Sequence, residues 1–239
     1  MKLSIDTLIG SITGVLLLAW GVLSATQNWE IFMSQASALI VFGGSITAAF
    51  IGFRWRYLKA ALFDILTIYA QQSINPKSLS QDVKMILEWS RIIKTDGKKG
   101  LQQIIDTSKD EFTSYAFTLV STGYKPDEVH EMAVTSIEEH YFRRLTETNI
   151  LNSMASSAPA FGMVGTLIGL IVMLGQMEDP SKMGPGLSMA LLTTLYGVLV
   201  ARFIFQPTST KVKQKLGINR FREFLLLNGI IMIMEKRSP

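Results

Sequence analysis

Two apolar stretches of this 239-residue chain each carry a threonine on a helical face that is otherwise made of small residues. The first stretch contains Pro159, Gly162, Thr166 and Gly169. Their spacings of 3, 4 and 3 residues place them on one side of a helix. Small residues let a second membrane helix approach closely, and a threonine in hydrocarbon needs a hydrogen-bond partner or lines a wet path. This face therefore indicates a tight helix contact or one wall of an ion path.

The second stretch repeats the arrangement with Ala190, Thr194, Gly197 and Ala201. Thr193 precedes Thr194, but neighbours on a helix point about 100° apart, so the two hydroxyls do not face one path squarely. We expect Thr166, Thr194 and the adjacent Thr193 to be ion-path residues. The alternative for Thr166 and Thr193 is a hydrogen bond to a carbonyl of the same helix.

The other residues that could do chemistry point away from catalysis. The three glycines Gly162, Gly165 and Gly169 form no phosphate loop, because no strand precedes them and no Gly-Lys-Ser/Thr follows. His130 and His140 are ten residues apart on one predicted helix, on different azimuths, so they predict no zinc site. We expect no catalytic residue, no cofactor and no bound metal beyond a transported ion. Helix packing is the role expected for Gly162, Gly165, Gly169, Ala190, Gly197 and Ala201.

Four stretches are nearly uncharged and long enough for a helix to cross about 30 Å of hydrocarbon. They are residues 3–23, 31–53, 150–175 and 184–205. Apart from their ends, these stretches contain no Asp, Glu, Lys or His. A cation path through hydrocarbon needs a carboxylate or a cage of oxygen ligands. If the chain conducts a cation, the charged ligand must therefore come from another polypeptide.

The elements that position these residues are helices. The sequence predicts an all-α membrane protein with four transmembrane helices and a helical cytoplasmic insert between the second and the third. We expect the first transmembrane helix pair in 1–53, the insert in 54–149, the second pair, which lines the ion path, in 150–207, and a basic tail in 208–239. Thr95-Asp96-Gly97 is a turn signal within the insert, and Pro126 opens the helix that leads into the third span.

The distribution of positive charge predicts the topology. Of the 23 basic residues, 13 lie between Arg54 and Arg144 and seven between Lys211 and Arg237. The positive-inside rule then places both termini and the insert in the cytoplasm. The net charge of +4 is explained by this topology and by anionic lipid, so it does not indicate nucleic acid. The absence of cysteine excludes disulfides.

Three motifs carry a resemblance to a known family: APAFGMVGTLIGL at 158–170, MEDPSKMGP at 177–185 and ALLTTLYG at 190–197. With two spans before the insert and two after it, the chain resembles the MotA/PomA stator subunits of the flagellar motor, within the MotA/TolQ/ExbB proton channel superfamily. The resemblance implies an inner-membrane protein in which five copies surround two copies of a single-span MotB/PomB-type partner. That partner supplies the aspartate that carries the ion. Its periplasmic domain binds peptidoglycan.

The resemblance also implies roles for individual residues. Pro159 and Pro207 match two family prolines linked to torque generation. Thr166 and Thr194 match hydroxyls that sodium-driven members place beside the ion, whereas proton-driven members commonly have alanine at one or both positions. Sodium is therefore the expected ion, with the proton as the alternative.

The part of the insert expected to contact a FliG-type rotor protein departs from the family pattern. Arg91 can stand for the family arginine, and Lys98 and Lys99 lie in the stretch that follows it, where glutamines replace the expected glutamates. Two alternatives remain: a motor of the same superfamily that energises gliding, outer-membrane transport or phage defence, and a membrane scaffold without ion flow. ExbB/TolQ proteins typically have one span before the insert, which argues against that branch. Relatives usually continue beyond Pro239, so the chain is naturally short or trimmed.

The topology can be tested with single cysteines. An impermeant thiol reagent applied to intact cells is expected to label Ser181→Cys, because the connector 176–183 lies outside. It should not label Lys98→Cys, which lies inside. The reverse pattern would overturn the topology.

Overall fold

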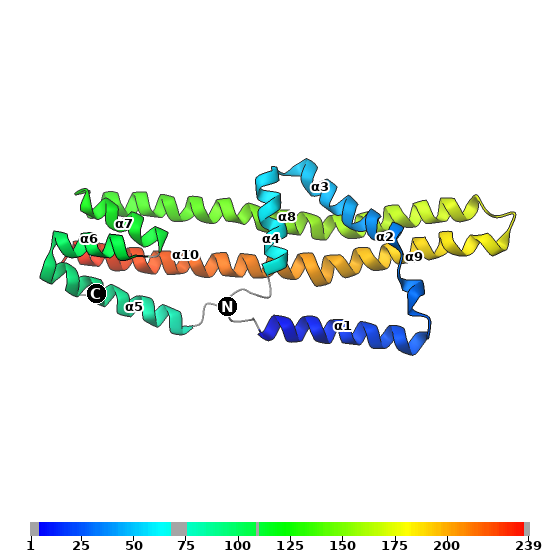
Figure 1. Cartoon of the computed structure of the whole chain (residues 1–239). Coiled ribbons are helices and arrows are strands. Elements are labelled where there is room, and N and C mark those ends of the chain that lie inside the picture. Colours follow the sequence, from blue (N-terminus) through cyan, green and yellow to red (C-terminus); the bar gives the residue numbers. More distant parts are fainter. Residues whose placement is uncertain (1–4, 68–75, 109, 237–239) are drawn as a thin grey trace. The chain divides into compact units, whose positions relative to one another are not determined.

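The computed structural model describes residues 5–67, 76–108 and 110–236, and all secondary structure in these ranges is helical (Figure 1). The predicted all-α class is confirmed at this level. Three stretches are long and apolar enough to cross a membrane: Trp29–Gly52, Pro126–Leu174 and Pro180–Met234. The first predicted span forms helix α1 (Ile5–Ala25), of which the described apolar segment Ile9–Ala25 is just below that length. The count of four spans therefore stays a prediction.

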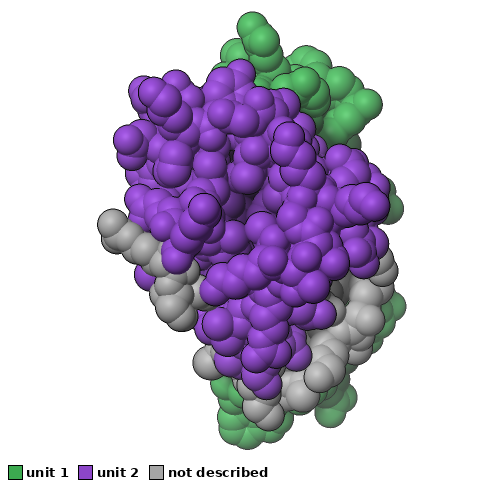
Figure 2. Space-filling view, turned by 90° about the vertical axis from the view of Figure 1, so that its left-hand side faces the viewer, with its two compact units in different colours: residues 1–72, 146–213 green, residues 73–145, 214–239 purple. Residues whose placement is uncertain are grey.

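The chain divides into two compact units, coloured separately in Figure 2. Unit 1 comprises residues 1–72 and 146–213, and unit 2 comprises residues 73–145 and 214–239. Helices α8 (Pro126–Leu174) and α10 (Gln206–Met234) contribute residues to both units.

Unit 1 contains the apolar helices. They are α1, α2 (Gln35–Ala38), α3 (Gly44–Gly52), α4 (Trp55–Thr67), the second part of α8, α9 (Met183–Val200) and the beginning of α10. A polar turn starts α2, since Ser34 Oγ accepts a hydrogen bond from Ser37 N. Phe53 has an extended backbone, which ends α3 and turns the chain into α4.

Two π-helical turns interrupt these helices, at Leu39–Gly43 and at Ala201–Phe205. The second one comes directly before Pro207. Proline lacks an N–H and its ring clashes with the carbonyl four residues earlier, and a widened turn relieves both problems without ending the helix. Neither turn follows from hydrophobic periodicity, so the sequence did not predict them.

Unit 2 is built on α5 (Pro76–Asp96), α6 (Lys98–Thr107), α7 (Glu111–Ser121) and parts of α8 and α10. Gly97 joins α5 to α6 with φ 54°, a conformation that favours glycine. This agrees with the turn signal in the sequence. The Asp110 side chain caps α7 by accepting a hydrogen bond from Thr113 N.

The core of unit 2 contains side chains from all of its helices. Its fully or nearly fully buried members include Ile86, Leu101, Ile104, Phe117, Ala133, Ile137, Leu226, Leu227 and Ile230. Trp89 packs edge-on against Phe117, with ring centroids 5.2 Å apart. Three of the core residues come from α10, in the stretch expected as a basic tail. That stretch is helical through Met234 and supplies one apolar face to the core.

Candidate functional site

Helices α8 and α9 approach each other along a seam of glycines, which we call the glycine seam (Gly162, Gly165, Gly169, Gly186 and Gly197). A methyl group added to Gly169 would lie 2.6 Å from Gly186 O, and one added to Gly197 would lie 2.7 Å from Ala158 O. One added to Gly162 would lie 3.0 Å from Thr193 O. At these positions the two backbones are too close for any larger side chain, as in close-packed membrane helices.

Thr193 belongs to this seam. Its side chain is fully buried, and its hydroxyl donates to Met189 O or Ala190 O at 3.0 and 2.9 Å. A methyl group on Gly165 would lie 2.5 Å from Thr193 Cβ. The structure therefore places Thr193 in the helix contact, with its hydroxyl bonded to its own helix.

Thr166 and Thr194 lie differently. Thr166 is half-buried and donates to Met163 O at 2.6 Å, which leaves the oxygen lone pairs of its hydroxyl able to accept or to coordinate. Thr194 is exposed in the single chain, although its backbone borders the seam at Gly162. Only Thr193, of the three predicted ion-path threonines, is enclosed between α8 and α9.

The remaining predicted residues lie as follows. Pro159 is half-buried within α8, and its Cα lies 3.2 Å from a methyl group placed on Gly197. Ala190 and Ala201 are buried, Ala190 against Gly169. Pro207 follows the second π-helical turn. The structure thus brings Pro159 directly onto α9.

Tyr196, in the motif ALLTTLYG, fastens α9 to the segment before α2. Its hydroxyl donates to Phe32 O and accepts from Ser34 N at 3.1 Å. Ser37, three residues after Ser34, is buried, and its hydroxyl donates to Met189 O of α9 at 3.4 Å. Sequence reasoning missed these contacts, since nothing in the local pattern of residues 32–37 names a partner about 160 residues away.

A second polar contact joins α8 to α10 within unit 1. Ser209 is buried, and its hydroxyl lies 2.7 Å from Asn152 Oδ1 and 3.2 Å from Thr148 O. The sequence shows Asn152 and Ser209 only as polar residues near the ends of two apolar stretches. It does not show that they pair, because they are 57 residues apart.

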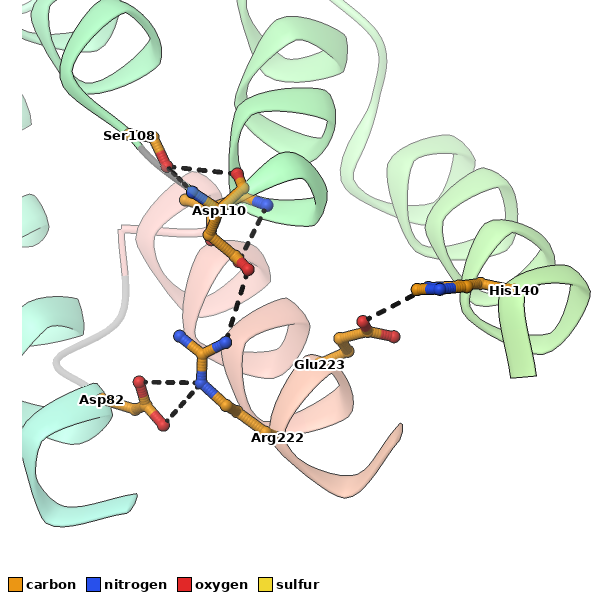
Figure 3. Close-up of polar contacts among 7 residues, drawn as sticks. Asp82, Ser108, Asp110, His140, Arg222 and Glu223 are labelled. Carbon is orange, nitrogen blue, oxygen red and sulfur yellow. Dashed lines mark hydrogen bonds and ion pairs between the residues drawn. The ribbon is translucent and has the colours of Figure 1, made fainter. Parts of the chain in front are cut away.

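Unit 2 contains a partly buried charge cluster centred on Arg222 of α10 (Figure 3). Arg222 Nε lies 2.9 and 3.0 Å from the two carboxylate oxygens of Asp82 on α5, and Nη1 lies 3.4 Å from Asp110 Oδ1 at the start of α7. Burial opposes the charge of Arg222, but Asp82 and Asp110 raise its pKa overall. One arginine thus joins three helices of this unit.

Glu223, the next residue, faces His140 of α8 in a pocket of about 430 Å³ (Figure 3). His140 Nδ1 lies 3.8 Å from Glu223 Oε1. Burial raises the pKa of Glu223 to about 7, with the Asp110 charge acting in the same direction and Arg222 in the opposite one. The pocket therefore holds a carboxylate that titrates near neutral pH.

The predicted rotor-contact residues are on the surface of unit 2. Arg91, Lys98 and Lys99 are all exposed, near the turn between α5 and α6. In the part of the chain that the structure describes, there is no group of three or more His, Asp or Glu side chains that could hold a metal ion.

The sequence model of the MotA/TolQ/ExbB proton channel family matches residues 104–220. Motility protein A of Aquifex aeolicus is 29% identical over 242 residues, which cover 99% of this chain and 92% of that protein. Chemotaxis protein PomA of Vibrio alginolyticus is 27% identical over 208 residues, 87% of this chain and 80% of that protein. The flagellar MotAB stator complex from Bacillus subtilis contains a chain with the same fold, with a TM-score of 0.84, 22% identity and coverage of 97% and 90%.

Apolar helices of spanning length with a glycine-lined helix contact define a helical, multi-pass membrane protein. Residues 104–220 match the MotA/TolQ/ExbB proton channel family, and this match, the MotA and PomA relatives and the MotAB structure together support a MotA-type stator subunit. The resemblance noted in the sequence is thereby confirmed. This is a family of channel and stator subunits and not a class of enzymes.

The glycine seam can be tested at Gly165. Gly165→Ala places a methyl group 2.5 Å from Thr193 Cβ, so α8 and α9 must separate, at a cost of about 1–3 kcal/mol. We expect a lower midpoint of heat-induced aggregation for the protein purified in detergent. Gly217→Ala is the control, because a methyl group there meets nothing within 4 Å and should gain up to about 1 kcal/mol of helix stability. Equal midpoints for the two variants would contradict the close contact between α8 and α9 at Gly165.

The pKa of Glu223 predicts that the stability of unit 2 depends on pH. This pKa is about 7 in the folded chain against a reference of 4.5, so the folded state holds a proton that the unfolded state has lost between these values. The free energy of unfolding therefore falls as pH rises through this window, and the full cost is present above pH 7. Glu223→Gln should remove this loss, on the order of 2 kcal/mol at pH 8.

The measurement is hydrogen exchange of α7 and α10 peptides at pH 6 and pH 8, corrected for intrinsic exchange rates. Protection in the wild type should drop more between the two pH values than in Glu223→Gln. Glu131→Gln, which changes an exposed carboxylate on α8, should behave like the wild type. If both variants keep the wild-type pH dependence, Glu223 is not its source.

Proposed function

We propose that this chain is an ion-conducting stator subunit of a flagellar motor. The observation that carries the proposal is the arrangement around the glycine seam: Thr193 closes the contact between α8 and α9, whereas Thr166 and Thr194 keep hydroxyl oxygens outside it. The match of residues 104–220 to the MotA/TolQ/ExbB proton channel family supports this proposal. A membrane scaffold would use the same seam but would not need the two outer hydroxyls.

The partner in this proposal is a MotB/PomB-type single-span subunit that supplies the ion-binding aspartate. The predicted spans contain no carboxylate away from their ends, and neutral hydroxyls alone do not offset the dehydration of a cation. The related chain from Bacillus subtilis is part of a MotAB stator complex. By the same resemblance, five copies of this chain surround two partner copies in the inner membrane, with both termini in the cytoplasm.

Sodium is the proposed coupling ion and the proton is the alternative. Sodium sheds part of its hydration shell only where oxygen ligands replace it, and the hydroxyls of Thr166 and Thr194 can do this. A proton that reaches a carboxylate through water needs no such ligand. Both threonines are present here, as in sodium-driven members of the family.

Torque in this proposal passes from the spans to unit 2. Pro159 fixes a close contact between α8 and α9, and Pro207 follows a π-helical turn, so both lie where a change in helix angle would be transmitted. Arg91, Lys98 and Lys99 are exposed and available to a rotor protein of the FliG type. A second candidate is a motor of the same superfamily with another load, favoured by the glutamines Gln102 and Gln103 in place of acidic residues.

The proposal is tested by motility and conductance in cells that lack their own stators and co-express this chain with its single-span partner. Thr166→Ala or Thr194→Ala should abolish or sharply reduce sodium-dependent rotation, because alanine offers no ligand oxygen. Thr→Ser at either position should be milder. Rotation speed is measured against external sodium at fixed pH and controlled membrane potential.

Thr210→Ala is the matched control, since Thr210 is exposed on α10 and its hydroxyl only donates to Gln206 O. It should leave the sodium dependence unchanged. Wild-type speed that does not depend on sodium would contradict the sodium assignment and leave protons as the coupling ion. No partner-dependent conductance for either ion would contradict the stator proposal itself.

A further inference from the structure

Helix α4 presents an exposed face that no part of unit 1 covers. Trp55, Phe63 and Leu66 have 51, 63 and 78% of their surface exposed, and Lys59 is exposed between them. At 100° per residue these four side chains fall within about 80° of arc. Three large apolar groups in one narrow stripe are more than scattered surface residues, so this face has a partner.

The charge of this face has one sign. Arg54, just before α4, and Arg56 and Lys59 within it are all exposed. The only acidic residue of α4 is Asp64, which is buried on the opposite side together with Leu58 and Ala61. The exposed face therefore offers cations and apolar rings and no carboxylate, which is complementary to an anionic surface with an apolar layer beneath it.

The basic groups are held beside aromatic rings. Lys59 Nζ lies 4.9 Å from the centroid of the Trp55 ring, and Arg56 Cζ lies 5.2 Å from that of Tyr57. Trp55 also packs edge-on against Phe50, the centroids being 5.6 Å apart. Tryptophan with neighbouring basic groups is typical of the headgroup layer, where one side of the ring is apolar and the other is wet.

The position of α4 in the chain agrees with this. The candidate span Trp29–Gly52 ends one extended residue and one arginine before α4 begins at Trp55. A helix that starts at the end of a span starts at the boundary of the hydrocarbon. Its apolar stripe can then enter the acyl region while its basic groups remain among the headgroups.

We infer that the exposed face of α4 is a binding surface for anionic phospholipid, with Arg56 and Lys59 on the phosphates and Trp55, Phe63 and Leu66 in the outer acyl layer. This goes beyond the proposed stator function and does not depend on the coupling ion. A second copy of the chain is the competing occupant, and the labels described below distinguish it from lipid.

Depth in the bilayer is the first test. Because the chain has no cysteine, a nitroxide label can be placed at Phe63→Cys or Leu66→Cys alone, with Lys125→Cys, an exposed position just before α8, as the control. The protein is reconstituted in vesicles of phosphatidylcholine with phosphatidylglycerol. We expect the α4 labels to collide with oxygen and to be shielded from a water-soluble nickel complex, and the control label to show the reverse.

Lipid specificity is the second test. Phosphatidylglycerol that stays bound after purification in nonionic detergent is quantified by mass spectrometry for the wild type, for Arg56→Gln/Lys59→Gln and for Lys84→Gln/Lys125→Gln. The last pair removes the same charge from exposed sites in unit 2. Bound phosphatidylglycerol should fall severalfold in the α4 variant and stay at the wild-type level in the control.

Three outcomes would overturn the inference. Labels on α4 that are open to the nickel complex would place the face in water. Labels shielded from both reagents and broadened by one another would show that a second copy covers the face. Equal loss of phosphatidylglycerol in both charge variants would show attraction by net charge alone. Conductance with the partner, measured on the same variants, keeps these outcomes separate from failure of the stator proposal.

Discussion

The structure of unit 1 depends on how closely the backbones of α8 and α9 approach. Hydrocarbon supplies no hydrophobic force between helices, so association rests on contact between atoms, and contact this close needs glycine on both sides. Gly162, Gly165 and Gly169 on one helix and Gly186 and Gly197 on the other meet this requirement. The position of every neighbouring side chain follows from it, including which threonine is enclosed and which are left outside.

The same constraint separates packing from chemistry. A hydroxyl in the seam must be satisfied within its own helix, and Thr193 does this by donating to a carbonyl one turn back. Outside the seam, a hydroxyl oxygen is available to whatever lies next to it. The predicted spans offer hydroxyl oxygens but no carboxylate away from their ends, and this is the physical reason why the proposed ion path includes a second polypeptide.

Unit 2 is organised by charge as well as by its apolar core. Arg222 holds carboxylates from α5 and α7, and loss of the arginine would remove the ion pair of the buried Asp82. Glu223 beside it lacks an equivalent partner and titrates near neutral pH. Unit 2 is thus joined by an ion-pair cluster around Arg222 of α10, next to a carboxylate whose pKa is raised by burial.

The sequence by itself determined the helical class, the apolar stretches, the small-residue faces, the turn at Gly97 and the family, because periodicity, glycine spacing and motif identity are local properties. It did not reveal the π-helical turns, the hydrogen bonds from Tyr196 to Phe32 and Ser34, the Arg222 cluster, or the use of α10 in the core. It separated Thr193 from Thr194 by their angle on the helix but did not reveal which of the two faces α8. Only the tertiary structure decided these features, because each depends on which segment lies opposite a given helix. The residue pattern of a helix indicates its apolar face but not the segment that packs against that face.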